Sequence, residues 1–342
     1  MPKKYTVIET WIVNEVKPAE STSAEQTYER LEKVAGILPV LDIPQDLTQE
    51  SHFVDEALIR DFVAHISPAR QVLDIGCGDG WPLLRIAPFF ESVTGIDAAE
   101  RRVANAKTNA ERLGLKNVTV KKMSALNLEF PDESFDGVTA ATAIEQTPDP
   151  YQALREVFRV LKPGGKLRVY FETFAANSKG VIERVFVSEI DDALGYHYVL
   201  KHPSPPWERS YLVKFSPTPE MKEEFRRLKD LIERLGSIPT QAPEIGLEFL
   251  QRNQSRITGG SWYELEHFTS ATMKQTLEEI GFTDVRICYS AGTFARKIWS
   301  GIAMDGLNAV QLKDLAQALA ELTVTVEATS VPGEPITASK PE

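Results

Sequence analysis

The chain of 342 residues contains only two cysteines, Cys77 and Cys288. They lie far apart and in unlike contexts, so they predict neither a disulfide framework nor a cysteine-rich zinc site. The five histidines show no H-x-x-x-H spacing. The sequence therefore predicts no metal site, and most of the histidines are expected to be structural.

Long apolar runs and an excess of positive charge are also lacking. No run approaches the roughly 20 apolar residues that a membrane span needs, and the first residues lack the apolar core and cleavage site of a signal peptide. A net charge of −11 disfavours nucleic acid or anionic lipid as a partner, because both require a basic surface. A hydrophobic fraction of 42% is ample for the buried core of a soluble protein, and the two isolated cysteines favour a reducing cytoplasm. A homo-oligomer stays possible.

Short apolar runs alternate with helical patterns between residues 53 and 172. The predicted strands are 71–75, 92–96, 118–122, 135–141 and 166–171. Helices are expected between them, one of them starting at Asp149-Pro150, where a capping side chain precedes a proline. This alternation predicts a parallel sheet with helices on both faces and ligands at the carboxyl ends of the strands.

The alternation stops after Glu172. Helical patterns at 179–192 and 219–235 predict a largely helical insertion, 174–261, which would act as a substrate cap. A helix is then expected at 269–280, followed by strands at 285–289 and 293–299, the last of them antiparallel. The predicted organisation is an accessory segment 1–50 with a strand at 5–16, a main domain of 51–173 and 262–300, the cap 174–261, and a C-terminal helix with a disordered tail in 301–342.

A glycine-rich turn carries the chemistry. Segment 72–80 places Gly76, Gly78 and Gly80 at alternate positions where a strand turns into a helix, so that the backbone can approach a ligand. A dinucleotide enzyme would instead show G-x-G-x-x-G around a pyrophosphate. The carboxylate of Asp74, on the strand before the turn, would repel phosphate but suits an ammonium group.

Further motifs follow in a fixed order, at 95–97, 131–138, 148–150 and 154–167. The first ends in Asp97, about twenty residues beyond the glycines, where a carboxylate can accept both hydrogen bonds of a ribose diol. In order and spacing the motifs resemble the class I S-adenosylmethionine-dependent methyltransferases, particularly the ubiquinone and menaquinone biosynthesis enzymes and many small-molecule methyltransferases. The resemblance covers about 53–172 and, more weakly, 269–299.

The resemblance implies a Rossmann-like, seven-stranded, mostly parallel sheet, S-adenosylmethionine as cofactor and S-adenosylhomocysteine as product. Asp74 would then hold the cofactor's amino group directly or through water, the three glycines would pass beside its methionine part, and Asp97 would bind the ribose. The remaining implied cofactor contacts are Ala98, then Ser124, Ala125 and Leu126 beside adenine, and Ala140 and Ala141 near the sulfonium.

Two positions depart from the family pattern. Ser124 stands where many relatives carry an aspartate, and 144–147 reads Ile-Glu-Gln-Thr where relatives often carry histidine. The amide of Gln146 cannot serve as a base, so no catalytic residue is assigned. The candidates to face the substrate are Trp81, Gln146, Glu172 and His197, and ordinary packing or surface exposure is the alternative for each.

The implied reaction is an in-line displacement in which an oxygen, nitrogen or carbon atom of a small-molecule acceptor attacks the methyl group. Positioning can contribute about 7 to 11 kcal/mol, so an ionised or amine nucleophile needs no base. The alternatives are a nicotinamide-nucleotide oxidoreductase and a cofactor-binding module without catalysis. The turn spacing and Asp74 favour methyl transfer, and the acceptor is not identified.

Overall fold

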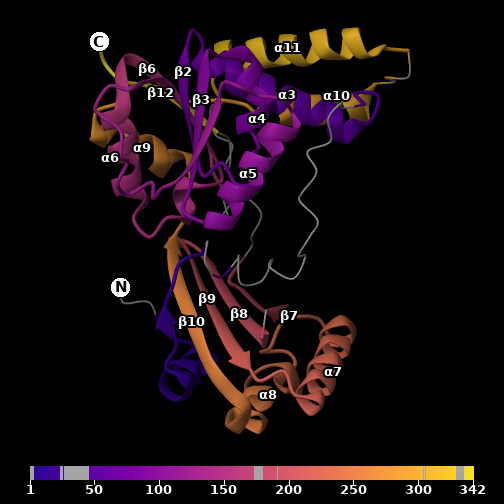
Figure 1. Ribbon diagram of the computed structural model, residues 1–342. Coiled ribbons are helices and arrows are strands. Elements are labelled where there is room, and N and C mark those ends of the chain that lie inside the picture. Colours follow the sequence, from indigo (N-terminus) through magenta and orange to yellow (C-terminus); the bar gives the residue numbers. More distant parts are fainter. Residues whose placement is uncertain are drawn as a thin grey trace. The chain divides into compact units, whose positions relative to one another are not determined.

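The computed structural model describes residues 4–23, 26, 46–172, 180–190, 192–302, 304, 306–328 and 335–342. The chain divides into two compact units (Figure 1). One, here called the antiparallel unit, comprises Met1–Ile37 and Asn177–His267. The other, the Rossmann unit, comprises Leu38–Ala176 and Phe268–Glu342.

Within the described residues, the Rossmann unit contains a seven-stranded sheet in the order β11-β12-β6-β5-β2-β3-β4. The strands are β2 (Gln71–Ile75), β3 (Ser92–Asp97), β4 (Val118–Lys122), β5 (Phe135–Ala141), β6 (Leu161–Tyr170), β11 (Thr283–Ile287) and β12 (Ile336–Ser339). The pairings among β2 to β6 are parallel, and β12 is antiparallel to both of its neighbours, β6 and β11. This confirms the predicted fold class.

Helices cover both faces of this sheet. They are α3 (Glu50–Ile66), α4 (Leu83–Ile86), α5 (Glu100–Arg112), α6 (Pro150–Val160), α9 (Ser270–Ile280), α10 (Ala291–Gly301) and α11 (Ala309–Thr325). Neighbouring residues of a strand point to opposite faces. Val72 accordingly packs in the core with residues of α3 and α5, whereas Leu73 packs with residues of α6 and α9. Helix α6 begins as predicted, with Asp149 accepting a hydrogen bond from the amide of Gln152.

The predictions for the last part of the chain were partly wrong. Residues 293–299 lie in helix α10 and not in a strand, because Ala291 and Ala295, one helical turn apart, are buried against α3 and α11. Residues 336–339, expected in a disordered tail, form β12, which supplies the antiparallel strand between β6 and β11. The predicted C-terminal helix is α11.

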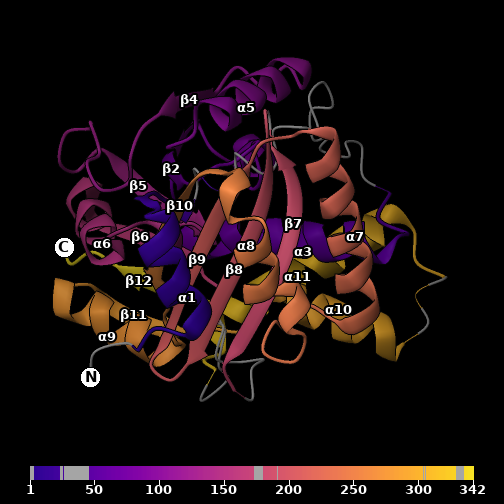
Figure 2. The same ribbon diagram turned by 90° about the horizontal axis from the view of Figure 1, so that it is seen from below.

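The antiparallel unit contains a five-stranded sheet in the order β1-β10-β9-β8-β7. Its strands are β1 (Ala19–Glu20), β7 (Ile182–Ile190), β8 (Ala193–Pro203), β9 (Pro206–Phe215) and β10 (Ile257–Glu266). Helices α1 (Val7–Trp11), α7 (Pro219–Leu235) and α8 (Leu247–Arg252) pack on one face of this sheet (Figure 2). Their shared core includes Tyr196, Phe215, Phe225 and Phe249.

The prediction of a largely helical insertion was therefore wrong. Helix α7 is present, but residues 182–190, which were expected to be helical, form β7, paired along its length with β8. Ile182, Val185, Phe186 and Ile190 have helical spacing, and cross-strand pairing overrides that local pattern. Residues 7–16, expected in a strand, are helical, with Ile8 and Ile12 one turn apart in the core.

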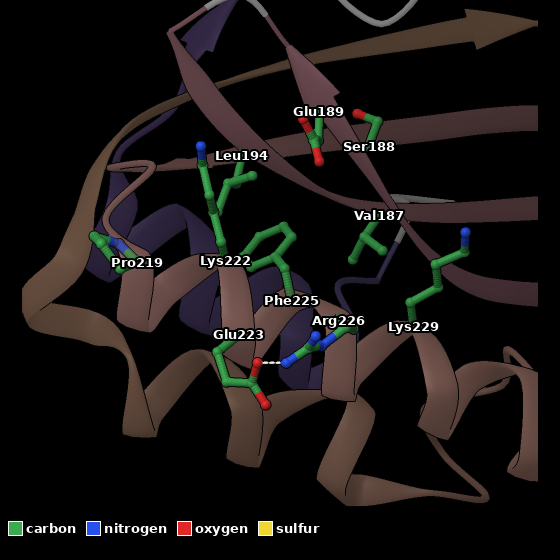
Figure 3. A pocket seen from close by; sticks show the side chains of 10 residues that line it. All are labelled: Val187, Ser188, Glu189, Leu194, Pro219, Lys222, Glu223, Phe225, Arg226 and Lys229. Carbon is green, nitrogen blue, oxygen red and sulfur yellow. Dashed lines mark ion pairs between the residues drawn. The ribbon is translucent and has the colours of Figure 1, made fainter.

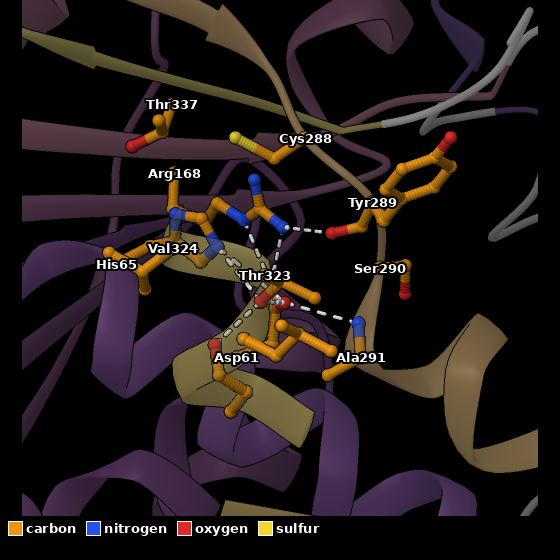
Figure 4. A network of polar contacts seen from close by, with 12 residues as sticks. Asp61, His65, Arg168, Cys288, Tyr289, Ser290, Ala291, Thr323, Val324 and Thr337 are labelled. Atoms are coloured by element: carbon orange, nitrogen blue, oxygen red, sulfur yellow. Dashed lines mark hydrogen bonds and ion pairs between the residues drawn. The ribbon is translucent and has the colours of Figure 1, made fainter. Parts of the chain in front are cut away.

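A buried polar network fixes α3 to the Rossmann sheet and to the C-terminal helices (Figure 4). Asp61 Oδ2 and Arg168 Nη2 form an ion pair at 2.6 Å, and both side chains are fully buried. Thr323 Oγ1 and the amide of Ala291 donate to Asp61 Oδ1 at 2.8 and 3.2 Å. Burial lowers the pKa of His65, beside Thr323, to about 3, so this histidine is neutral. These contacts assign the network a structural role.

Candidate functional site

The glycine-rich turn lies at the carboxyl end of β2, beside the end of β3 and the loop after β5. Gly76, Gly78 and Gly80 all have positive φ angles of 69°, 53° and 116°. Only glycine adopts such angles without steric cost. At Gly76 there is a second constraint, because a Cβ atom would lie 2.3 Å from the Cβ of Ala143. The turn is thus packed directly against the residues that follow β5.

Asp97 ends β3 and ties three segments together. The amide of Gly78 donates to its Oδ2 at 3.1 Å, and the amide of Ala99 donates to its Oδ1 at 2.9 Å. Its carbonyl accepts from the amide of Met123, in the loop after β4, at 3.0 Å. Burial raises the pKa of Asp97, and the two amide bonds oppose that rise. Each carboxylate oxygen keeps further acceptor capacity, so the group can still receive a diol.

Asp74 is fully buried on β2. Thr139 Oγ1 donates to its Oδ1 at 2.7 Å, whereas Oδ2 has no hydrogen bond of normal geometry within the described chain. Burial raises the pKa of Asp74 to about 7, against the lowering effects of the Thr139 hydroxyl and of the Leu83 amide. A buried acceptor without a partner is costly. An ammonium group bound at the turn, directly or through water, would supply the missing donor, so the residues fit the amino-acid and ribose parts of the expected cofactor.

The other residues predicted to contact the cofactor differ in how far their side chains are exposed. Ala98 and Ser124 are exposed, and Ala125, Leu126 and Ala141 are half-buried. Ser124 Oγ accepts from the amide of Leu126 at 3.2 Å, which shapes the loop after β4. Ala140 is buried in the hydrophobic core, because alternation along β5 turns its side chain away from that of Ala141. Only the backbone of Ala140 is available to a ligand.

Trp81 follows the turn, as predicted, but its contacts are those of a packed residue. Its Nε1 donates to Asp55 Oδ1 on α3 at 2.6 Å. Its ring meets that of Phe62 edge-on, with centroids 6.0 Å apart. These two contacts account for Trp81 without a substrate.

The loop after β5 and the end of β6 are joined by a carboxylate that the sequence prediction missed. Glu145, in a 3-10 turn with Gln146, is fully buried, and its Oε1 accepts from the amide of Glu172 at 2.8 Å. Gln146 is half-buried and Glu172 is exposed. The structure therefore brings these two substrate candidates to adjacent strand ends. The sequence of residues 144–147 contains no pattern that predicts the burial of Glu145.

Thr142, the residue after β5, was also missed. Its φ is 51°, which is a genuine outlier for a β-branched residue. Its amide donates to the carbonyl of Tyr170 at 2.8 Å, and its side chain is exposed. Such strained residues cluster at functional sites, so Thr142 joins the candidates that border the turn. No sequence signal marks it.

His197 lies in the antiparallel unit. Its Nε2 is 2.7 Å from Ser188 Oγ, and its ring stacks on Phe186 with centroids 4.4 Å apart. A Cβ atom at Gly195 would lie 2.9 Å from Ser188 Oγ and 3.1 Å from His197 Nε2, so glycine makes room for the pair. The buried ring of His197 is thereby explained by packing within its own sheet.

A second polar cluster in the antiparallel unit surrounds Glu208 on β9. Lys201 Nζ lies 2.7 Å from its Oε2, the Tyr263 hydroxyl donates to its Oε1 at 3.0 Å, and His267 Nε2 is 3.5 Å from Oε2. Burial opposes the charge of Glu208, but His267 and Lys201 outweigh burial and lower its pKa to about 2. The cluster thus presents an ionised carboxylate beside Lys201, Tyr263 and His267. The sequence prediction missed it because its members come from different elements of the unit.

The antiparallel unit also has a groove of about 560 Å³ between α7 and the hairpin of β7 and β8 (Figure 3). Val187, Leu194 and Phe225 give it apolar walls. Figure 3 shows Lys222 and Lys229 reaching from α7 toward the strands, while Arg226 pairs with Glu223.

Within the described ranges, no three side chains of His, Cys, Asp or Glu gather as metal ligands would. In the same part of the chain, none of the helices reaches the length and apolarity of a membrane span.

Comparison with known proteins places the similarity in the Rossmann unit. Residues 73–169, from β2 to β6, match the family described as a methyltransferase domain. The chain is 38% identical over 125 residues to 27-O-demethylrifamycin SV methyltransferase of Amycolatopsis mediterranei, covering 34% of this chain and 46% of the relative. It is 32% identical over 151 residues to phosphatidylethanolamine N-methyltransferase of Cereibacter sphaeroides, covering 42% and 71%.

A third relative is demethylmenaquinone methyltransferase of Listeria welshimeri, with 38% identity over 106 residues, 30% of this chain and 44% of the relative. The chain spans less than half the length of the first and third of these relatives.

Proposed function

Because the chain belongs to the class I S-adenosylmethionine-dependent methyltransferases, we propose that it methylates an oxygen, nitrogen or carbon atom of a small-molecule metabolite. The observation that carries this proposal is the arrangement at the carboxyl ends of β2 and β3, where the glycine-rich turn lies between Asp74 and Asp97. When bound, S-adenosylmethionine supplies a methyl group activated by a sulfonium. Asp97 would accept hydrogen bonds from the ribose hydroxyls, and Asp74 would accept one from the amino group.

The chain's own contribution to the reaction is binding and orientation. Asp97 is held by the amides of Gly78 and Ala99, so its oxygens are fixed before a ligand arrives. Such preorganisation supports transfer, since positioning alone can contribute about 7 to 11 kcal/mol. Asp74 disfavours the alternative of a nicotinamide nucleotide, because its carboxylate would face the pyrophosphate.

The test of this proposal is a calorimetric comparison of S-adenosylhomocysteine with NAD and NADP. We expect only the first to bind, and Asp97→Asn to weaken it about tenfold or more, since a hydrogen bond to a charged group is worth about 1.5–3 kcal/mol. Asp79→Asn is the matched control, because Asp79 is in the same turn but its Oδ1 accepts from Asn105 on α5. Equal loss in both variants, or tight NAD binding, would contradict the assignment.

We also propose that the antiparallel unit binds the acceptor. The larger part of this unit, Asn177–His267, follows β6 in the chain, and the unit has its own core. Glu208 with Tyr263 and His267 offers polar contacts to an acceptor. In this proposal Tyr263→Phe leaves S-adenosylhomocysteine binding unchanged and lowers turnover in a panel of phenol, alcohol and amine acceptors. Unchanged turnover of every accepted compound would refute the role. A cytoplasmic enzyme is part of the proposal, in keeping with the buried thiols of Cys77 and Cys288.

A further inference from the structure

The guanidinium of Arg102 lies against the glycine-rich turn. Arg102 is in the first turn of α5, and a Cβ atom on Gly78 would lie 3.1 Å from its Nη1 and 3.7 Å from its Cδ. The side chain is half-buried, and burial lowers its pKa. The neighbouring Arg101 is exposed. Of these two adjacent arginines, Arg102 is the one that lies against Gly78.

Gly78 connects this guanidinium to the candidate ribose site. The amide of Gly78 donates to Asp97 Oδ2 at 3.1 Å. Arg102 lies beside the position that a Cβ atom of residue 78 would occupy. A side chain at position 78 would need the guanidinium to move. The glycine therefore makes room for Arg102, in addition to the approach of a cofactor that the sequence suggested.

We infer that Arg102 is a second ribose ligand, which donates to the hydroxyl oxygens while Asp97 accepts their hydrogens. A hydroxyl is both donor and acceptor, whereas a carboxylate only accepts and a guanidinium only donates. Asp97 alone would leave the ribose oxygens without donors, and Arg102 brings a planar fork of N–H groups to the same turn. The inference rests on the proposed binding of the ribose by Asp97.

The test compares S-adenosylhomocysteine with its 2′,3′-dideoxy analogue by calorimetry on the full chain. We expect Arg102→Met to weaken S-adenosylhomocysteine about tenfold to a hundredfold, as for the loss of a hydrogen bond to a charged group. The same variant should bind the dideoxy analogue as the wild type does. Arg101→Met, the matched control, should change neither affinity.

The outcomes separate this inference from the proposal beneath it. If the wild type binds both ligands equally, Asp97 does not bind the ribose, and the proposed role of Arg102 is contradicted as well. If the wild type prefers the hydroxyls but Arg102→Met weakens both ligands equally, or weakens neither, Asp97 keeps its role and Arg102 is only a packing residue. Arg102→Gln, which keeps a donor, serves as a second variant and should keep part of the preference for hydroxyls. Thermal transitions of all variants establish that they are folded.

Discussion

Replacing Asp74 by asparagine should remove a pH dependence of folding that this one buried carboxyl creates. Its pKa is raised from 3.8 to about 7, chiefly by burial. Between these two values the unfolded chain loses the proton while the folded protein keeps it. The contribution of Asp74 to stability is therefore greatest below about pH 4 and falls as the pH rises toward 7. The pKa rises by about three units, and at 1.36 kcal/mol per unit this corresponds to about 4 kcal/mol of unfolding free energy.

Asparagine has the same shape, and its Oδ1 can still accept from Thr139, but it does not titrate. At pH 8 the variant should be more stable than the wild type by up to about 4 kcal/mol, and the advantage should shrink toward pH 5. Binding of S-adenosylhomocysteine should show the opposite trend, because the ionised Asp74 is the form that attracts an ammonium group. Wild-type affinity should rise with pH up to about 7, and the variant should bind weakly at every pH.

Urea unfolding at pH 5, 6, 7 and 8, followed by tryptophan fluorescence, measures the stability difference between the two proteins. Taking the difference cancels the groups that titrate in both proteins. A difference that stays constant from pH 5 to 8 would show that Asp74 titrates normally, and the reasoning from burial would be wrong. Calorimetry at the same pH values measures the second effect.

Three further changes test the packing around the site. Gly76→Ala should destabilise the fold by about 2 kcal/mol or more in urea, because a positive φ costs about 1–2 kcal/mol and the new Cβ would meet Ala143 at 2.3 Å; a neutral effect would contradict the close packing. Asp61→Asn should cost about 3–5 kcal/mol, because it leaves the charge of Arg168 buried and unpaired; a loss below 1 kcal/mol would mean that the pair is hydrated. Truncation after residue 328 should lower the thermal transition temperature by several degrees through loss of β12. An unchanged transition temperature would show that β12 does not contribute to stability.

Much of the Rossmann unit could be predicted from short stretches of sequence. Strands β2, β4 and β5 begin and end where the apolar runs predicted them. Helix α6 begins at its predicted cap. The three glycines lie where the strand was predicted to turn, and their positive φ angles are a finding of the structure. Each of these features depends on a few neighbouring residues, so local propensity and turn chemistry suffice to specify it.

The site itself was predicted only in part. Asp74, Gly78 and Asp97 come together at one turn because the carboxyl ends of adjacent parallel strands meet at one edge. The approach of Arg102 to Gly78 could not be predicted, because it depends on the direction of a long side chain on α5. The strained backbone of Thr142 carried no sequence signal either.

Two strands, β12 and β7, could not be predicted from local sequence, because each is stabilised by pairing with a strand elsewhere in the chain. Strand β12 has four residues, too few for a periodic signal, and it is ordered by pairing with β6; Thr337 Oγ1 donates to the carbonyl of Leu167 from 170 residues away. Strand β7 has apolar residues at helical spacing and yet pairs with β8. Local sequence was enough to specify strands β2, β4 and β5, helix α6 and the glycine-rich turn that we propose binds the cofactor. Elements whose hydrogen-bond partners lie far along the chain were decided by the fold, because their free energy comes from contacts that exist only once the fold has formed.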